Sequence, residues 1–188
     1  MKAEMYAKDL KRLIAATQKF IDTDPCKPIH MYIRLEFSKE FSTVTAIGVN
    51  GYQMSVEHSV CGNVDEDFIA YIKPGLPKFH KNSAATIAVK DKVCFIGIDG
   101  CYTGYKQPEG DFLDWKNVLN PLIEKEPVYR IGFNGNYLIN ALQAAQASAG
   151  SFKQPAVLEF RSPLSPILLK TNKDDYKIVL PIRLKEEN

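Results

Sequence analysis

The feature that most constrains the fold is a pattern that occurs twice: a short strand, an amphipathic helix and then several antiparallel strands. The first helix is predicted over 8–21. Its apolar side chains recur at the i, i+3, i+4, i+7 spacing of one buried face, at Leu10, Leu13, Ile14, Thr17 and Ile21. The second helix is predicted from 137 to about 148, with a buried face formed by Leu138, Ala141, Leu142 and Ala145. Short strands precede the two helices, at 2–6 and 128–133. The pattern predicts an α+β fold with internal pseudo-repetition.

Alternating and β-branched residues predict the remaining strands. They lie at 31–37, 43–49, 52–60, 67–73, 86–89, 93–98, 101–105, 156–160, 166–171 and 176–184. The pair Asn50-Gly51 suits the positive φ angles of a type I′ hairpin turn, and Asp99-Gly100 marks another turn. Residues 75–84 are predicted to hold at most a stunted helix. The proline- and glycine-interrupted segment 106–127 is predicted to be a connector.

Composition describes an ordinary globular protein of 188 residues, 45% hydrophobic and 24% charged. The formal charge of +2 is small for a protein that binds nucleic acid tightly, so any DNA contact must come from local patterning or from assembly. The four cysteines form no CxxC pair and the three histidines do not cluster near them, so neither a metal nor another cofactor is expected. Reduced thiols, with no apolar run of about 20 residues and no signal peptide, predict a cytoplasmic protein without a membrane span.

Catalytic motifs are missing from the sequence. It contains no GxSxG, no GxxxxGK[ST], no HExxH and no GxGxxG after a strand. The acidic run 65–67 is interpreted as a solvated turn, and His58 and His80 have no sequence partner that would orient a general base. A non-enzymatic protein is therefore predicted, although a catalytic cysteine could still be assembled from distant residues.

The first helix carries a basic stripe opposite its buried face. At about 100° per residue, Lys8, Arg12 and Lys19 fall within one narrow wedge, and Lys11 lies beside them. Such a stripe can contact nucleic-acid phosphates without reading bases. The alternative is a solvated outer face with no ligand, and the stripe alone does not decide between them.

Five segments, in order along the chain, resemble the bacterial sliding clamp, the β subunit of the replicative DNA polymerase III. Leu10–Gln18 resembles the first helix of the clamp's middle domain, and Val49–Met54 resembles its "TDGHRLA" hairpin. Glu109–Leu119 resembles the "DGxFPDYxxVLP" connector to the last domain. Ile131–Leu142 resembles "IGFNxxYLxDxLxAL" in that domain, and Val179–Leu184 resembles the C-terminal "VMPMRL".

The resemblance implies antiparallel sheets with helices that face a central hole, where basic groups meet the backbone of double-stranded DNA. Lys8, Lys11, Arg12 and Lys19 match that role. It also implies a pocket between the middle and last domains for short peptides of polymerase or repair proteins. The matching positions are Tyr32, Val49, Gly51, Tyr52, Gln53 and Met54 on one side, and Pro121, Ile178, Leu180, Pro181, Ile182, Arg183 and Leu184 on the other.

Chain length separates this sequence from the family, whose members have three domains and close a ring as dimers. The sequence resembles the middle domain, 1–127 with connector 106–127, fused to half of the last domain, 128–188; one continuous domain is the alternative. Two functions follow as expectations. One is a self-associating sliding-clamp-like protein that tethers replication or repair partners to DNA, which the basic first helix favours. The other is a monomeric peptide-binding or regulatory module, which the near-neutral charge and the uncharged second helix favour.

Overall fold

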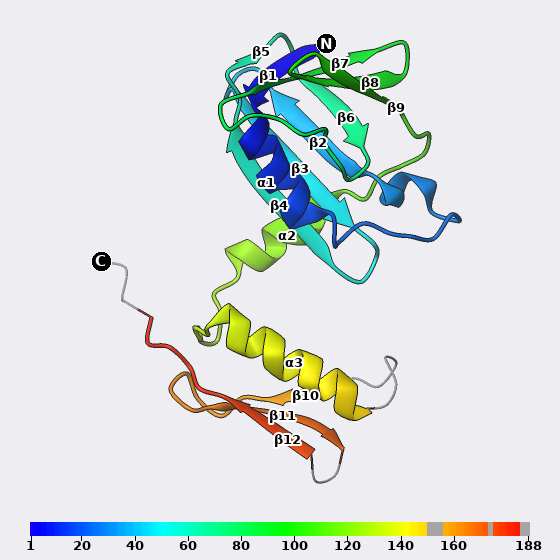
Figure 1. The fold of residues 1–188 in the computed structure, drawn as a ribbon. Helices are drawn as coiled ribbons and strands as arrows, with labels where there is room; N and C mark the ends of the chain where they lie inside the picture. The colour runs from blue at the N-terminus through cyan, green and yellow to red at the C-terminus, as the bar shows by residue number, and fades with distance from the viewer. Residues whose placement is uncertain (150–155, 173–174, 185–188) are drawn as a thin grey trace. The chain divides into compact units, whose positions relative to one another are not determined.

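The computed structural model describes residues 1–149, 156–172 and 175–184. The chain divides into two compact units, Met1–Trp115 (unit 1) and Lys116–Asn188 (unit 2), and each is described by itself (Figure 1). The division between 127 and 128 expected from the sequence remains a proposal. No helix among the described residues is long and apolar enough to cross a membrane.

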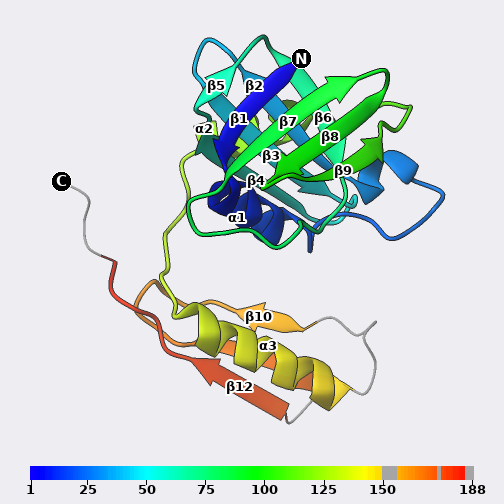
Figure 2. The same ribbon diagram turned by 45° about the horizontal axis from the view of Figure 1, so that its top comes forward.

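Unit 1 contains two antiparallel sheets (Figure 2). One has the order β4-β3-β2-β6, formed by β2 (Ile33–Ser38), β3 (Thr43–Val49), β4 (Met54–Val60) and β6 (Phe68–Ile72). The other has the order β5-β1-β7-β8-β9, formed by β1 (Lys2–Tyr6), β5 (Asn63–Val64), β7 (Ala84–Lys90), β8 (Val93–Ile98) and β9 (Cys101–Lys106). The first half of unit 1 runs from β1 to β5 and the second half from β6 to β9. Strand β1 pairs with β7 of the second half, and β6 pairs with β2 of the first half.

The core of unit 1 lies between these sheets and helix α1 (Ala7–Thr17), which packs on β3, β4, β1 and β7. Leu10 and Leu13 of α1 are fully buried, as are Leu35 of β2 and Ile87 of β7. Burial alternates along β2, as the period of a half-buried strand requires. The amphipathic patterns therefore produced a helix and strands that share one apolar core.

Helix α1 ends four residues before the end predicted from its pattern. Thr17 is its last residue, and the Thr17 hydroxyl donates to the Leu13 carbonyl at 2.7 Å. Strand β3 passes so close that a Cβ on Gly48 would lie 2.5 Å from the Thr17 carbonyl oxygen. The chain then turns, with Phe20 N donating to Thr17 O, because β3 leaves no room for another helical turn. The expectation of a helix to Ile21 was wrong for this reason.

The hairpin turns confirm one expectation and correct another. Asp99 and Gly100 both have positive φ, 49° and 79°, between paired residues Ile98 and Cys101, as a type I′ turn requires. At Asn50-Gly51 only the glycine has positive φ, and the loop spans four residues between β3 and β4. The Asn50 Oδ1 instead accepts hydrogen bonds from the backbone N–H groups of residues 52 and 53, at 3.1 and 3.2 Å. This side-chain cap replaces the type I′ turn.

Two strands of unit 1 begin later than predicted. A 3₁₀ helix, η1 (Pro28–Met31), occupies the start of the strand predicted from residue 31. Strand β4 begins at Met54 because the loop capped by Asn50 takes up the residues before it. Between β6 and β7 the chain forms no helix, which agrees with the prediction of at most a stunted helix over 75–84.

Unit 2 has one helix packed on one small sheet. Helix α3 (Gly135–Ala149) covers one face of the antiparallel sheet β10-β11-β12, formed by β10 (Val157–Glu159), β11 (Ile167–Asn172) and β12 (Asp175–Val179) (Figure 1). The buried core joins helix residues to sheet residues: Ala141, Ala145, Ile167, Leu169 and Val179.

The beginning of unit 2 differs from the predictions. The connector contains a helix, α2 (Trp115–Glu124), with Pro121 inside it, and the Trp115 indole donates to the Glu36 carboxylate at 2.9 Å. The strand predicted at 128–133 is reduced to a single bridge between Gly132 and Ile182, and the strand predicted over 176–184 ends at Val179. These were errors of tertiary context, because a strand needs a neighbour with which to pair.

Candidate nucleic-acid interface and peptide pocket

The outer face of α1 presents the basic residues predicted from the helical pattern. Lys8, Lys11 and Arg12 are exposed, and the buried face of the helix lies beneath them. The Lys8 ammonium lies 5.0 Å from the Tyr6 ring centroid, and the Lys11 ammonium lies 5.8 Å from the Phe79 ring centroid. Aromatic faces attract such cations weakly at exposed sites, so these contacts leave both ammonium groups available to an anion.

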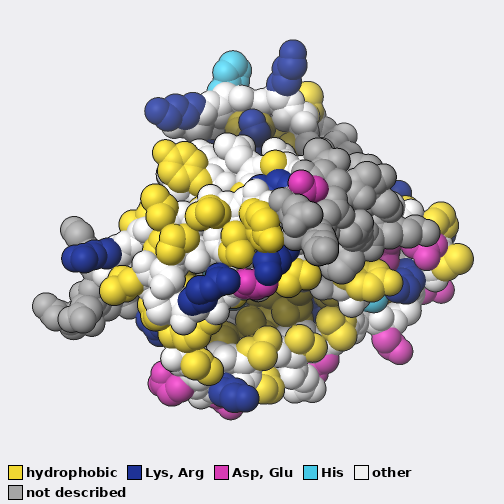
Figure 3. All heavy atoms as spheres, turned by 90° about the horizontal axis from the view of Figure 1, so that it is seen from below, with side chains coloured by type: hydrophobic (Ala, Val, Ile, Leu, Met, Phe, Trp, Pro, Cys, Tyr) yellow, Lys and Arg dark blue, Asp and Glu magenta, His cyan; other side chains and the backbone are white. Residues whose placement is uncertain are grey.

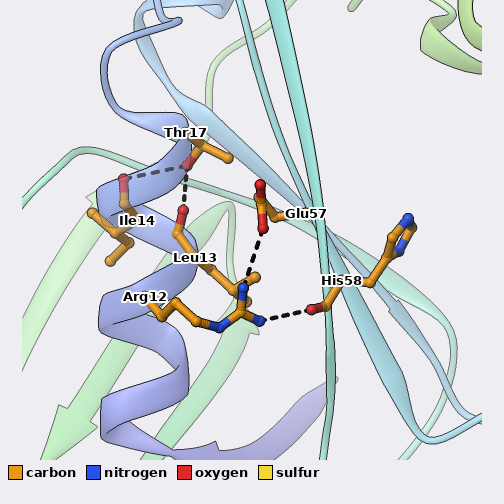
Figure 4. A network of polar contacts seen from close by, with 6 residues as sticks. All are labelled: Arg12, Leu13, Ile14, Thr17, Glu57 and His58. Carbon is orange, nitrogen blue, oxygen red and sulfur yellow. Dashed lines mark hydrogen bonds and ion pairs between the residues drawn. The ribbon is translucent and has the colours of Figure 1, made fainter. Parts of the chain in front are cut away.

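Arg12 is held in place by strand β4 (Figure 4). Its guanidinium donates to the Glu57 carboxylate at 3.1 Å and to the His58 carbonyl at 2.7 Å. Half of the side chain remains exposed, but the Glu57 carboxylate offsets its charge. Arg12 therefore fastens α1 to the sheet and contributes less positive potential than the lysines do. No pattern in the sequence indicated the pairing with Glu57.

Lys19 lies beyond the end of α1, in the turn that follows it, and is exposed. The Gln53 side-chain amide donates to the Lys19 carbonyl at 3.0 Å, which fixes this turn against the β3–β4 loop. Among the described residues, Lys8, Lys11 and Lys19 have no acidic partner in an ion pair. We call these three lysines and Arg12 the basic face.

A cavity of about 510 Å³ opens beside the basic face. The helix contributes Lys11, Ile14, Ala15 and Gln18, and the opposite wall is the segment 75–79, with Leu76, Lys78 and Phe79. This wall is the extended segment between β6 and β7 that forms no helix. Lys78 was not predicted as a site residue, because only the fold brings it to the cavity that Lys11 also lines.

The unit 1 residues expected to bind peptide surround the β3–β4 loop and η1. Tyr52 is 96% exposed, whereas Val49 is buried, so the Val49 side chain packs within the unit. Tyr32 follows η1, with the Lys73 ammonium 5.3 Å from its ring centroid. Gly51, Gln53 and Met54 complete this group; Gly51 and Gln53 are exposed and Met54 is half-buried.

The unit 2 residues expected to bind peptide lie within α2, in β12 or just after β12. Ile178, Leu180, Ile182 and Leu184 are exposed, at 66%, 70%, 52% and 54%. Pro121 lies within α2, Pro181 is half-buried and Arg183 is exposed. Exposed apolar side chains that lie close together along the chain are typical of a binding surface.

Part of this surface is hollowed. A cavity of about 250 Å³, which we call the C-terminal hollow, is lined by Arg130, Gly132, Pro163, Leu164, Ile182, Arg183 and Leu184. A Cβ at position 132 would lie 2.6 Å from Leu184 Cδ2 and 3.1 Å from the Ile182 carbonyl oxygen, so a larger residue there would displace the Leu184 side chain. The sequence indicated Ile182, Arg183 and Leu184 but not Arg130, Pro163 or Leu164, which the fold brings from elsewhere.

The face of the small sheet that α3 does not cover is apolar at its edges. Tyr176 and Ile178 of β12 and Val157 of β10 are 50%, 66% and 53% exposed. Glu159 and Lys170 form an ion pair at 2.8 Å on the same sheet, and the Lys170 side chain lies over the Tyr176 ring. Figure 3 shows a face of the molecule on which hydrophobic side chains are interspersed with Lys and Arg.

The four cysteines differ in exposure. Cys26 and Cys101 are exposed, whereas burial raises the pKa of Cys61 to about 11 and that of Cys94 to about 12. Because the thiolate is the reactive form, we expect maleimide to label two cysteines in the native protein and four after denaturation. Mass spectrometry counts the labels, and rapid labelling of Cys61 or Cys94 in the native state would contradict the burial.

Among the described residues no three His, Cys, Asp or Glu side chains gather as metal ligands would.

No family model matches this sequence. No curated protein matches it either.

Solved structures of bacterial sliding clamps are similar to this chain. The β subunit of the DNA polymerase of Streptococcus pyogenes has a TM-score of 0.80 at 16% identity, over 97% of this chain and 50% of that chain. The sliding clamp of Bacillus subtilis has a TM-score of 0.79 at 13% identity, over 100% and 50%. The Helicobacter pylori β clamp bound to a DNA ligase peptide has a TM-score of 0.72 at 14% identity, over 96% and 49%.

These similarities show that the chain has the sliding-clamp fold. The α+β, clamp-like architecture predicted from the sequence is thereby confirmed, and so is the resemblance at the level of fold. The chain spans about half the length of the clamps it matches.

Proposed function

We propose that this chain is a non-enzymatic, clamp-like protein that rests on or encircles double-stranded DNA and tethers replication or repair partners to it. The observation that carries the proposal is the basic face, whose three lysines have no acidic partner among the described residues: Lys8 and Lys11 lie on a helix whose other face forms the core, and Lys19 lies in the turn after it. Helix α1 packs on strands of both sheets of unit 1, so its backbone determines where the Lys8 and Lys11 side chains emerge.

Electrostatics defines what such a face recognises. Ammonium groups displace counterions from phosphates and read no base edges, so the expected ligand is the DNA backbone irrespective of sequence. The lysine side chains are long and exposed, and they can follow a backbone that slides past them. The net charge of +2 means that affinity depends on this local concentration of charge.

A salt titration of DNA binding tests the proposal. We expect the full chain to bind two duplexes of unrelated sequence with equal affinity, because no base is read. The logarithm of the affinity should fall with the logarithm of salt concentration with a slope of roughly −3, as about three phosphate contacts require. Fluorescence anisotropy measures both quantities. A preference for one sequence, or an affinity that salt does not change, would contradict the proposal.

Peptide binding is the second candidate, and the C-terminal hollow favours it. Its lining combines apolar side chains with two arginines, Arg130 and Arg183. Such a site suits a short segment with apolar anchors and an acidic group, since arginine pairs well with carboxylates. The H. pylori clamp similar in fold binds a DNA ligase peptide. In a clamp-like protein the two functions are compatible, because a peptide site on a DNA-bound protein is a tether.

A further inference from the structure

Unit 1 consists of two halves that share strands: β1, α1 and β2–β5 form the first half, and β6–β9, without a helix, form the second. Strand β1, which precedes α1, lies between β5 on one side and β7 on the other. In the other half of the unit, β6 pairs with β2, the strand that follows α1. Each half thus lends its first strand to the sheet of the other half.

Unit 2 repeats one half of this arrangement. The Ile182 N–H donates to the Gly132 carbonyl at 2.8 Å, as Gly62 N–H donates to the Glu4 carbonyl of β1 at 2.7 Å. The segment 130–133 before α3 is therefore the counterpart of β1, with its β5-like neighbour in place. Among the described residues no counterpart of β7 lies at its other edge.

Strand β10 is the second open edge. It is the counterpart of β2: Leu158 pairs with buried Leu169 in unit 2, as Leu35 pairs with buried Ala46 in unit 1. Strand β2 has a neighbour on each side, whereas β10 ends the described sheet of unit 2. An unpaired edge of this kind invites another strand.

Burial differs at the matching positions. Leu35 is fully buried, whereas its counterpart Leu158 is 36% exposed. Leu138 and Leu142 of α3 are only partly buried, although Leu10 and Ile14, at the same spacing in α1, are 0% and 5% exposed. Three further large side chains of unit 2 are exposed: Val128 at 94%, Tyr137 at 63% and Ile139 at 52%.

We propose that unit 2 of a second copy of this chain completes unit 2, so that two copies form one composite domain. The segment 130–133 of each copy would add to β10 of the other as an antiparallel strand, as β1 adds to β7 and β6 to β2. The interface is isologous, because a two-fold axis satisfies both open edges and covers both α3 helices.

A second copy fits better than another partner because unit 2 carries both the unpaired segment and the edge that accepts it. One molecule of a different protein would have to supply both elements. The inference rests on the strand pairing and burial, and it stands whether or not the basic face binds DNA.

The register predicts one contact across the interface. Leu35 lies opposite Ala70 of β6, two residues before Ile72, the last buried residue of that strand. In the segment 130–133, Phe133 is the partly buried residue at the end and takes the place of Ile72. The position two residues before Phe133 is Ile131. Ile131 of one copy should therefore lie opposite Leu158 of the other.

Disulfide cross-linking without DNA tests this contact. In a chain with Cys26→Ser and Cys101→Ser, the pair Ile131→Cys and Leu158→Cys should form an interchain disulfide on mild oxidation, because directly opposed strand residues lie within disulfide reach. Each cysteine alone should give no covalent dimer. Absence of the covalent dimer in the double variant would overturn the proposed register, even if the native chain were dimeric.

Solution mass tests the association itself. Light scattering after size exclusion should give twice the chain mass, or an even multiple of it. Ile131→Pro removes an N–H at the open edge and Leu158→Lys places a charge there, so each should yield monomer with an unchanged circular dichroism spectrum. Leu122→Lys, at an exposed position of α2, is the matched control and should leave the mass unchanged. A monomeric native chain throughout the micromolar range would overturn the proposal.

Discussion

Replacement of Lys8, Lys11 and Lys19 by glutamate is expected to abolish DNA binding while leaving the fold intact. All three side chains are exposed and none forms an ion pair with a described residue, so folding loses little. Each lysine removed should reduce the salt slope by about 1, and the added carboxylates repel phosphates. We expect affinity to fall by a factor on the order of 10³ at low salt. Arg12 is left in place because a glutamate there would face Glu57 and loosen α1 from β4.

Three other exposed lysines supply the control. Replacement of Lys39, Lys90 and Lys106 by glutamate changes the net charge equally but leaves α1 untouched. If net charge alone governed binding, both triple variants would lose affinity to the same extent. Equal losses, or full binding by the variant at Lys8, Lys11 and Lys19, would contradict the assignment of the basic face.

Charged residues at Leu180 and Ile182 are expected to eliminate peptide binding. Both side chains are exposed, at 70% and 52%, and Ile182 lines the C-terminal hollow, so glutamate at these positions replaces apolar contact with a charge. Loss of a buried apolar anchor at a binding site costs about 2 kcal/mol or more, which is roughly thirtyfold in affinity. The measurement is the affinity for the DNA ligase peptide bound by the H. pylori clamp.

The separate variants locate the peptide. Ile182→Glu should weaken binding more than Leu180→Glu, since Leu180 does not line the hollow. Leu122→Glu, at a similarly exposed position of α2, should have no effect. If the native chain bound the peptide and the double variant bound it equally well, the C-terminal hollow would not be the site.

Local pattern was sufficient where neighbours in sequence determine structure. The strands at 2–6, 43–49 and 93–98 were predicted to the residue, because alternation and adjacent turns define them. Elements that depend on distant contacts were mispredicted. The approach of Gly48 ends α1 early, and the segment 128–133 is not a strand because, among the described residues, it pairs with Ile182 alone.

In the candidate site, too, local sequence predicted some features, and distant contacts determined the others. Helical spacing placed Lys8, Lys11 and Arg12 on one face, which the structure shows to be exposed. It could not reveal that Arg12 pairs with Glu57, that Lys19 lies past the helix, or that Lys78 lines the same cavity as Lys11. These facts arise from residues that are far apart in sequence and meet only in the folded unit.

The most direct test of the proposed function is a photo-crosslink from the basic face to DNA. Ala15 is exposed on α1 beside Lys11, and Phe41, 69% exposed, lies in the turn between β2 and β3. A benzophenone amino acid at Ala15 should crosslink to duplexes of any sequence, and added salt should suppress the product, whereas the same group at Phe41 should give little product. Crosslinking from Phe41 but not from Ala15, or from neither, would contradict DNA binding through the basic face.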